Sequence, residues 1–136
     1  CADELLGRFP GARPVRVLAV ESQSGRDRAP DDYAAHVTRL TAARAYERAG
    51  VGPADIDVAE VHDASSSGEI VQVEALALCE PGRAGWAAER GELSLGGRIP
   101  VNVSGGLVSK GHPLAATGIG QLFAIQADAL QRASRV

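Results

Sequence analysis

Two histidines stand where predicted strands give way to predicted helices. His62 directly follows the segment 56–61, and His112 ends a glycine-rich stretch that follows the segment 98–103. A neutral imidazole can take a proton from a nucleophile, or donate a hydrogen bond to an oxyanion that develops during a reaction. We therefore take both as candidate catalytic groups, against the simpler interpretation of a surface or capping histidine. His36, expected inside a helix among polar residues, is given no role.

The elements that must position these histidines alternate along the chain. Alternating and β-branched residues predict strands at 14–20, 56–61 and 98–103. Helical spacing predicts helices from Asp31 or Asp32 to 49, from the serines at 65–67 to Cys79, and from Pro113 through Leu130, with a short helix or a turn at 85–91. Ser66 and Glu69 have the spacing of a capping box. Strands that alternate with helices predict an α/β layered domain with a largely parallel sheet, whose sites lie where strands end.

Composition narrows the class of protein. The 136 residues suffice for one domain, and 14 basic against 17 acidic residues give a net charge of −3. Lys110 is the only lysine, and scattered arginines make no basic patch, which argues against nucleic acid. No apolar run approaches the roughly 20 residues of a membrane helix. Two cysteines are too few for a disulfide framework, so we expect a cytoplasmic protein.

Other chemistries fit the sequence poorly. Gly106 and Gly111 have the spacing of a P-loop, but His112 and Pro113 stand where lysine and Ser/Thr would hold phosphate and magnesium. The three histidines and two cysteines lie too far apart for a zinc ligand pair, so we expect no metal. Cys79 lies at the end of an apolar helical run, where a buried, unreactive thiol is expected.

The sequence thus offers bases and oxyanion donors without a convincing nucleophile. The chain begins at Cys1 and contains no methionine. We therefore expect it to be a fragment of a longer chain, with the attacking group in the part that is not included.

The junction motifs resemble a known family. Asn102-Val-Ser-Gly-Gly106, followed by Gly111-His-Pro-Leu-Ala-Ala-Thr-Gly118, resembles the carboxyl-terminal half of thiolases. With His62-Asp63 upstream, the chain is most similar to the sterol-carrier-protein-type branch, called lipid-transfer-protein thiolases in bacteria. The resemblance runs from about Val15 to the last helix. It implies that residues 1–136 are a thiolase-like C-terminal domain, an α/β/α half with a mixed, largely parallel sheet between helices.

The resemblance also implies a reaction and roles. Thiolases form or cleave carbon–carbon bonds next to the thioester of coenzyme A, which is a substrate and not a resident cofactor. A cysteine in the amino-terminal half takes the acyl group. His112 matches the base that activates this cysteine, and His62 matches the histidine that helps to form the oxyanion hole for the enolate. The positions that match the supporting loop are Asn102, Ser104, Gly105, Gly106 and Gly111.

One departure from the family pattern leaves three functions open. Ala64 occupies the position where this branch carries an acid/base cysteine, and a methyl group moves no proton. The first hypothesis is an acyl-CoA acyltransferase similar to acetyl-CoA acetyltransferases. The second is a thiolase-like retro-aldolase, acting on a β-hydroxyacyl-CoA of the sterol side-chain type with a partner subunit. The third is a non-catalytic subunit. Expected partners are an acyl-CoA, the amino-terminal thiolase half, and a second copy or a heteromeric complex.

Overall fold

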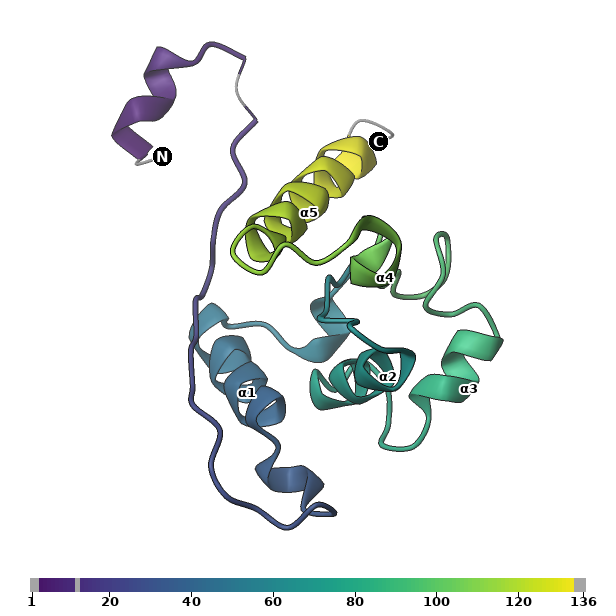
Figure 1. Ribbon diagram of the computed structural model, residues 1–136. Coiled ribbons are helices and arrows are strands. Elements are labelled where there is room, and N and C mark those ends of the chain that lie inside the picture. The colour runs from purple at the N-terminus through teal and green to yellow at the C-terminus, as the bar shows by residue number, and fades with distance from the viewer. Residues whose placement is uncertain (1–2, 12, 134–136) are drawn as a thin grey trace.

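The structure, a computed structural model, describes residues 3–11 and 13–133 and consists mainly of helices. Cys1, the first residue of the chain, lies outside the described residues. Figure 1 shows an extended amino-terminal segment along one side, with the helices gathered on the other. The α-helices are α1 (Val37–Ala49), α2 (Ser66–Ala75), α3 (Ala84–Glu89), α4 (Gly106–Lys110) and α5 (Thr117–Ala133), and the 3-10 turns are η1 (Asp3–Arg8), η2 (Tyr33–Ala35) and η3 (Pro53–Asp55).

The predicted sheet is not formed. Among the described residues, strand pairing is limited to one parallel bridge between Ala59 and Val101. The Ala59 N–H donates to the Pro100 carbonyl over 3.0 Å, and the Asn102 N–H donates to the Ala59 carbonyl over 2.8 Å. The pairing stops there because Asn102 has a φ of 55°, in the left-handed region, which turns the chain out of an extended path. The parallel direction of this pair agrees with the predicted topology, but its extent does not.

The segment 14–20 also differs from its prediction. It runs as an extended chain without helix or strand pairing. A strand needs a neighbour to bond its N–H and C=O groups, and the described residues place none beside this segment. Its apolar side chains are consequently exposed: Val15, Val17, Leu18 and Val20.

The predicted helices are present, with shifted starts. Asp32 caps η2 by accepting from the Ala35 N–H, and α1 begins only at Val37. His36 is therefore not inside a helix. It is the N-cap of α1, where its Nδ1 accepts from the Thr38 N–H. No helix among residues 3–11 and 13–133 is long and apolar enough to cross a bilayer.

Local hydrogen bonds and turns also set the ends of the later helices. Ser65, and not Ser66, caps α2 by accepting from the Gly68 N–H. This helix ends at Ala75, before Cys79, and Ala77 then adopts a φ of 56°. The glycine-rich stretch between the segment 98–103 and His112 contains α4, a helix that the sequence pattern did not predict. The last helix begins at Thr117 and not at Pro113.

A core of small aliphatic side chains lies around α2 and α3. Val73 of α2 is fully buried, and Ala84 and Ala87 of α3 pack against it. The two strand-like segments contribute their ends to the same cluster, which contains Ala59, Val61, Val73, Leu78, Ala84, Ala87, Leu93 and Ile99. Because both segments are anchored in this core, the chain that follows each of them starts from a fixed point.

A hydrogen bond ties α1 to the end of α2. The Tyr46 hydroxyl donates to the Leu76 carbonyl over 2.8 Å in a partly buried position. Tyr46→Phe should therefore lower the free energy of unfolding by about 1 kcal/mol, the usual net value of such a bond. Urea unfolding of wild type and variant measures this loss. An unchanged midpoint would mean that water replaces the tyrosine at Leu76.

Candidate active site

The structure brings His62 and His112 together from positions 50 residues apart. Their Nε2 atoms lie 3.2 Å from each other, and both residues are exposed. The rings meet edge to face, with centroids 4.9 Å apart and an angle of 80° between their planes. Two imidazole edges therefore converge on one accessible spot at the surface.

Hydrogen bonds assign opposite roles to the two Nε2 atoms. The Thr117 hydroxyl donates its proton to the Pro113 carbonyl, which can only accept. The same hydroxyl oxygen lies 2.8 Å from His112 Nδ1, so Nδ1 carries the proton and His112 Nε2 has a free lone pair. His62 must then donate its Nε2–H in the contact between the rings. The pair is thus one acceptor and one donor.

Side chains hold the chain that carries His62. The Val61 N–H donates to Asn102 Oδ1 over 2.8 Å, and Gln121 Nε2 donates to the Val61 carbonyl over 3.0 Å. Both peptide groups of this buried residue are thus bonded without a strand partner. Asn102 and Gln121 replace the strand ladder that the left-handed turn at Asn102 interrupts.

Asp63 fixes the start of α4. Its side chain is buried and accepts from the Leu107 N–H over 2.7 Å. A carboxylate at the first turn of a helix satisfies a backbone donor that would otherwise lack a partner. Gly106 makes this approach possible, because it has a φ of 70° and a Cβ there would overlap the Asp63 carboxylate.

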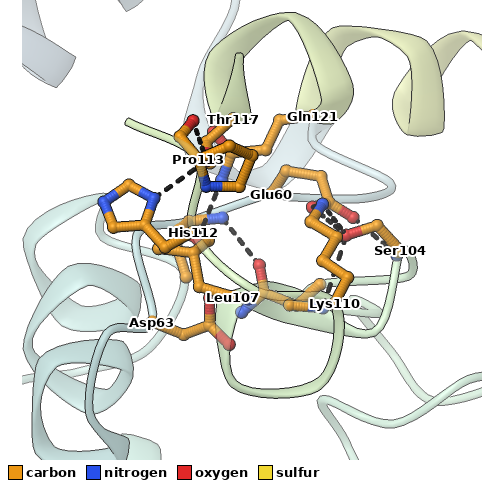
Figure 2. Close-up of polar contacts among 12 residues, drawn as sticks. Glu60, Asp63, Ser104, Leu107, Lys110, His112, Pro113, Thr117 and Gln121 are labelled. Atoms are coloured by element: carbon orange, nitrogen blue, oxygen red, sulfur yellow. Dashed lines mark hydrogen bonds and ion pairs between the residues drawn. The ribbon is translucent and has the colours of Figure 1, made fainter. Parts of the chain in front are cut away.

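A second carboxylate holds the other end of the glycine-rich stretch. Glu60 accepts from the Ser104 N–H over 2.8 Å and from the Ser104 hydroxyl over 2.7 Å. Lys110 lies 3.8 Å from the same carboxylate. In Figure 2, Ser104 and Lys110 lie beside Glu60, while Pro113 and Thr117 lie close to His112. Sequence reasoning gave no role to Glu60, Asp63, Lys110, Thr117 or Gln121.

The remaining candidates do not join the two histidines. Burial raises the pKa of the Cys79 thiol, and the nearby Arg98 lowers it by less. The thiol lies 3.7 Å from the Arg98 guanidinium. Ser65, which directly follows Ala64, uses its hydroxyl to cap α2. Within the described residues no cluster of three or more metal-binding side chains occurs.

The supporting-loop residues have distinct places. Asn102 and Ser104 make the contacts given above, and Gly106 admits Asp63. Gly105 and Gly111 flank α4 with φ values of 93° and 85°, which favour glycine. The loop is therefore two turns around one short helix, and this helix delivers His112.

Comparison with known proteins places this site in a family. Over 85 residues the chain is 49% identical to sterol carrier protein 2 from Bos taurus, covering 62% of this chain and 16% of that protein. It is 45% identical over 111 residues to an acetyl-CoA acetyltransferase from Methanothermobacter thermautotrophicus, covering 79% of this chain and 29% of the other. The chain spans less than a third of the length of either protein.

A solved structure has the same fold. The structure titled Ltp2-ChsH2(DUF35) aldolase superposes with a TM-score of 0.57 at 30% identity, covering 61% of this chain and 22% of that one. The family model described as thiolase C-terminal domain-like matches residues 19–131, which include both histidines and the whole glycine-rich stretch. The chain belongs to the thiolase family, as a C-terminal domain-like member.

Proposed function

We propose that this chain supplies the base and one oxyanion donor of an acyltransferase that forms or cleaves carbon–carbon bonds next to a CoA thioester. The observation that carries the proposal is the contact between His112 Nε2 and His62 Nε2, one with a lone pair and one with a proton. A base and a donor that face the same small space suit a reaction in which a proton leaves while an oxygen gains charge.

The proposed steps use each histidine once. His112 Nε2 takes the proton of a cysteine thiol that lies outside this chain, and the thiolate attacks the carbonyl of the acyl-CoA. The carbon–sulfur bond to CoA breaks, CoA leaves as its thiolate, and the acyl group stays on the cysteine. A base outside this chain takes the α-proton of a second thioester, and the His62 Nε2–H donates to the enolate oxygen. The enolate carbon then attacks the acyl carbon, and the carbon–sulfur bond to the cysteine breaks. The chain's likeness to an acetyl-CoA acetyltransferase supports acyl transfer.

A retro-aldolase is the second candidate, and Ala64 favours it. In that reaction His112 Nε2 takes the proton of a β-hydroxyl group, the bond between Cα and Cβ breaks to give a carbonyl product, and His62 stabilises the enolate left on the thioester. No acid/base cysteine and no acyl-enzyme is needed. The likeness to a solved structure titled as an aldolase supports this candidate, and with it a heteromeric partner in place of a second copy.

Intact-mass analysis separates the two candidates. We expect the protein expressed from its native gene to gain a covalent acetyl group when incubated with acetyl-CoA, because a cysteine activated by His112 would be acylated. The same preparation is then given a β-hydroxyacyl-CoA, and release of an aldehyde or ketone is followed. An adduct supports acyl transfer. Cleavage without an adduct contradicts acyl transfer and supports the aldolase. If neither an adduct nor cleavage is observed, the non-catalytic subunit is the remaining hypothesis.

A further inference from the structure

We propose that Glu60 is a positioning residue, which holds α4 so that His112 meets His62 with its lone pair directed at the shared space. This inference rests on the proposed function, because it assigns a further part of the same site. Glu60 lies two residues before His62, and Lys110 lies two residues before His112. A contact between Glu60 and Lys110 therefore links the two histidine-bearing segments directly.

The burial of Glu60 is the first argument. Its side chain has 0% exposure, whereas the side chain of its partner Lys110 has 29%. A fully buried carboxylate is costly unless hydrogen bonds and an opposite charge compensate for the lost water. Glu60 receives two hydrogen bonds from Ser104 and faces one ammonium group. Moving any of these donors away would leave the buried charge less fully compensated, so Glu60 favours the arrangement that keeps all three in place.

The contacts of the Ser104 hydroxyl require a hydrogen-bond acceptor at Glu60. The hydroxyl oxygen accepts from the Lys110 ammonium and, at 3.3 Å, from the Gly106 N–H. Both lone pairs are thereby used, so the hydroxyl proton can go only to Glu60. In Glu60→Gln, the amide NH₂ group would face either the Ser104 hydroxyl or the Ser104 N–H. Neither of these groups has a free acceptor for the NH₂ hydrogens.

Because α4 is short, the position of His112 depends on the side-chain contacts that hold the end of this helix. The helix has five residues, and Val108, Ser109 and Lys110 are exposed. Asp63 fixes its first turn through Leu107, and among the described residues the side-chain contacts that hold its last turn are those of Lys110 with Glu60 and Ser104. Gly111 follows at once, with a backbone that tolerates many paths. Without the Lys110 contacts, the position of His112 relative to Thr117 and His62 would vary.

The test uses two variants and a matched control. Glu60→Gln removes the charge at constant size, and Lys110→Met removes the cation from an exposed position while leaving both Ser104 hydrogen bonds to Glu60 in place. Glu92→Gln is the control, since Glu92 also pairs with two cations, Arg90 and Arg98, and is not among the residues that contact the histidines. The protein expressed from its native gene is labelled with ¹⁵N-histidine, because ¹⁵N shifts report which ring nitrogen carries the proton.

The expected result is a single Nδ1–H form of His112 in wild type and in Glu92→Gln, and a mixture of forms in Glu60→Gln and Lys110→Met. Turnover should fall by about 10- to 100-fold in both variants with little change in KM, the size of effect that a misplaced group produces. Folded variants with an unchanged His112 form would overturn the positioning role. Because the NMR readout needs no substrate, a failed activity assay with altered shifts would contradict the proposed function and leave this inference standing.

Discussion

His112→Ala should slow the reaction by about 10²- to 10⁴-fold, the usual contribution of a positioned general base. The variant loses the Nε2 lone pair of His112 that faces the other ring, and the Nε2 of His62 cannot replace it while it carries a proton. Turnover of the CoA thioester, measured at saturating substrate, checks the size of the loss. In the acetyl-CoA experiment the covalent adduct should disappear on the same time scale.

His36→Ala is the matched control for this experiment. His36 is the third histidine of the chain, and it caps α1 through its Nδ1. Burial lowers the pKa of His36, and the nearby charge of Arg28 lowers it further, so the neutral capping form is favoured. Its loss should cost stability of about 1 kcal/mol, as for other caps, and leave turnover unchanged well below the melting temperature. Equal loss of turnover in both variants would contradict a special role for His112.

Gly106→Ala should destabilise the protein by about 3–5 kcal/mol, the sum of a left-handed backbone and a core clash. The residue has a φ of 70°, and the added methyl would overlap the Asp63 carboxylate. Asp63 would have to withdraw, and the Leu107 N–H would lose its acceptor. Urea unfolding measures the change, and so large a loss is a considerable part of the stability of an ordinary domain.

Gly50→Ala separates the two contributions. Gly50 ends α1 with a φ of 69°, almost the same as at Gly106, but open space surrounds the position of its missing Cβ. This variant should lose only the backbone term, about 1–2 kcal/mol. Equal losses at the two glycines would show that Asp63 moves aside without cost, and would contradict the close fit described for α4.

Local signals in the sequence single out two histidines that the structure brings together. His62 and His112 were predicted to be candidates because each follows a strand-like run, and the structure anchors both runs in one core. The caps and glycines that set the helices were also readable, as at Ser65 and Gly50. The specific motif from Asn102 to Gly118 allowed the family to be recognised, and the family model confirms that recognition.

The sheet could not be predicted in the form observed, because alternation shows only that a strand is possible. Val15 and Val17 have the pattern of a strand, but pairing depends on a neighbour that no local pattern supplies. The end of the pairing at Val101 depends on the left-handed turn at Asn102. Asparagine is tolerated in that conformation, yet most asparagines do not adopt it, so the residue type alone does not predict the turn.

The roles of Glu60 and Thr117 depend on contacts between distant residues. Glu60 meets Ser104 across 44 positions, and a glutamate within an apolar run is equally compatible with a solvated edge. A weak signal existed, since charged residues in such runs are rarely buried without a partner. Lys110, the single lysine of the chain, was the matching charge.

The contact between the two rings has a consequence for selectivity. Each imidazole satisfies the other, so a group that enters between them must replace a donor and an acceptor at once. A thiol or a hydroxyl does both, because its hydrogen can go to His112 while its lone pair accepts from His62. A bare carbonyl oxygen accepts from His62 but offers no hydrogen to the Nε2 of His112. We therefore expect this pair of rings to favour groups that both donate and accept, before any bond is made or broken.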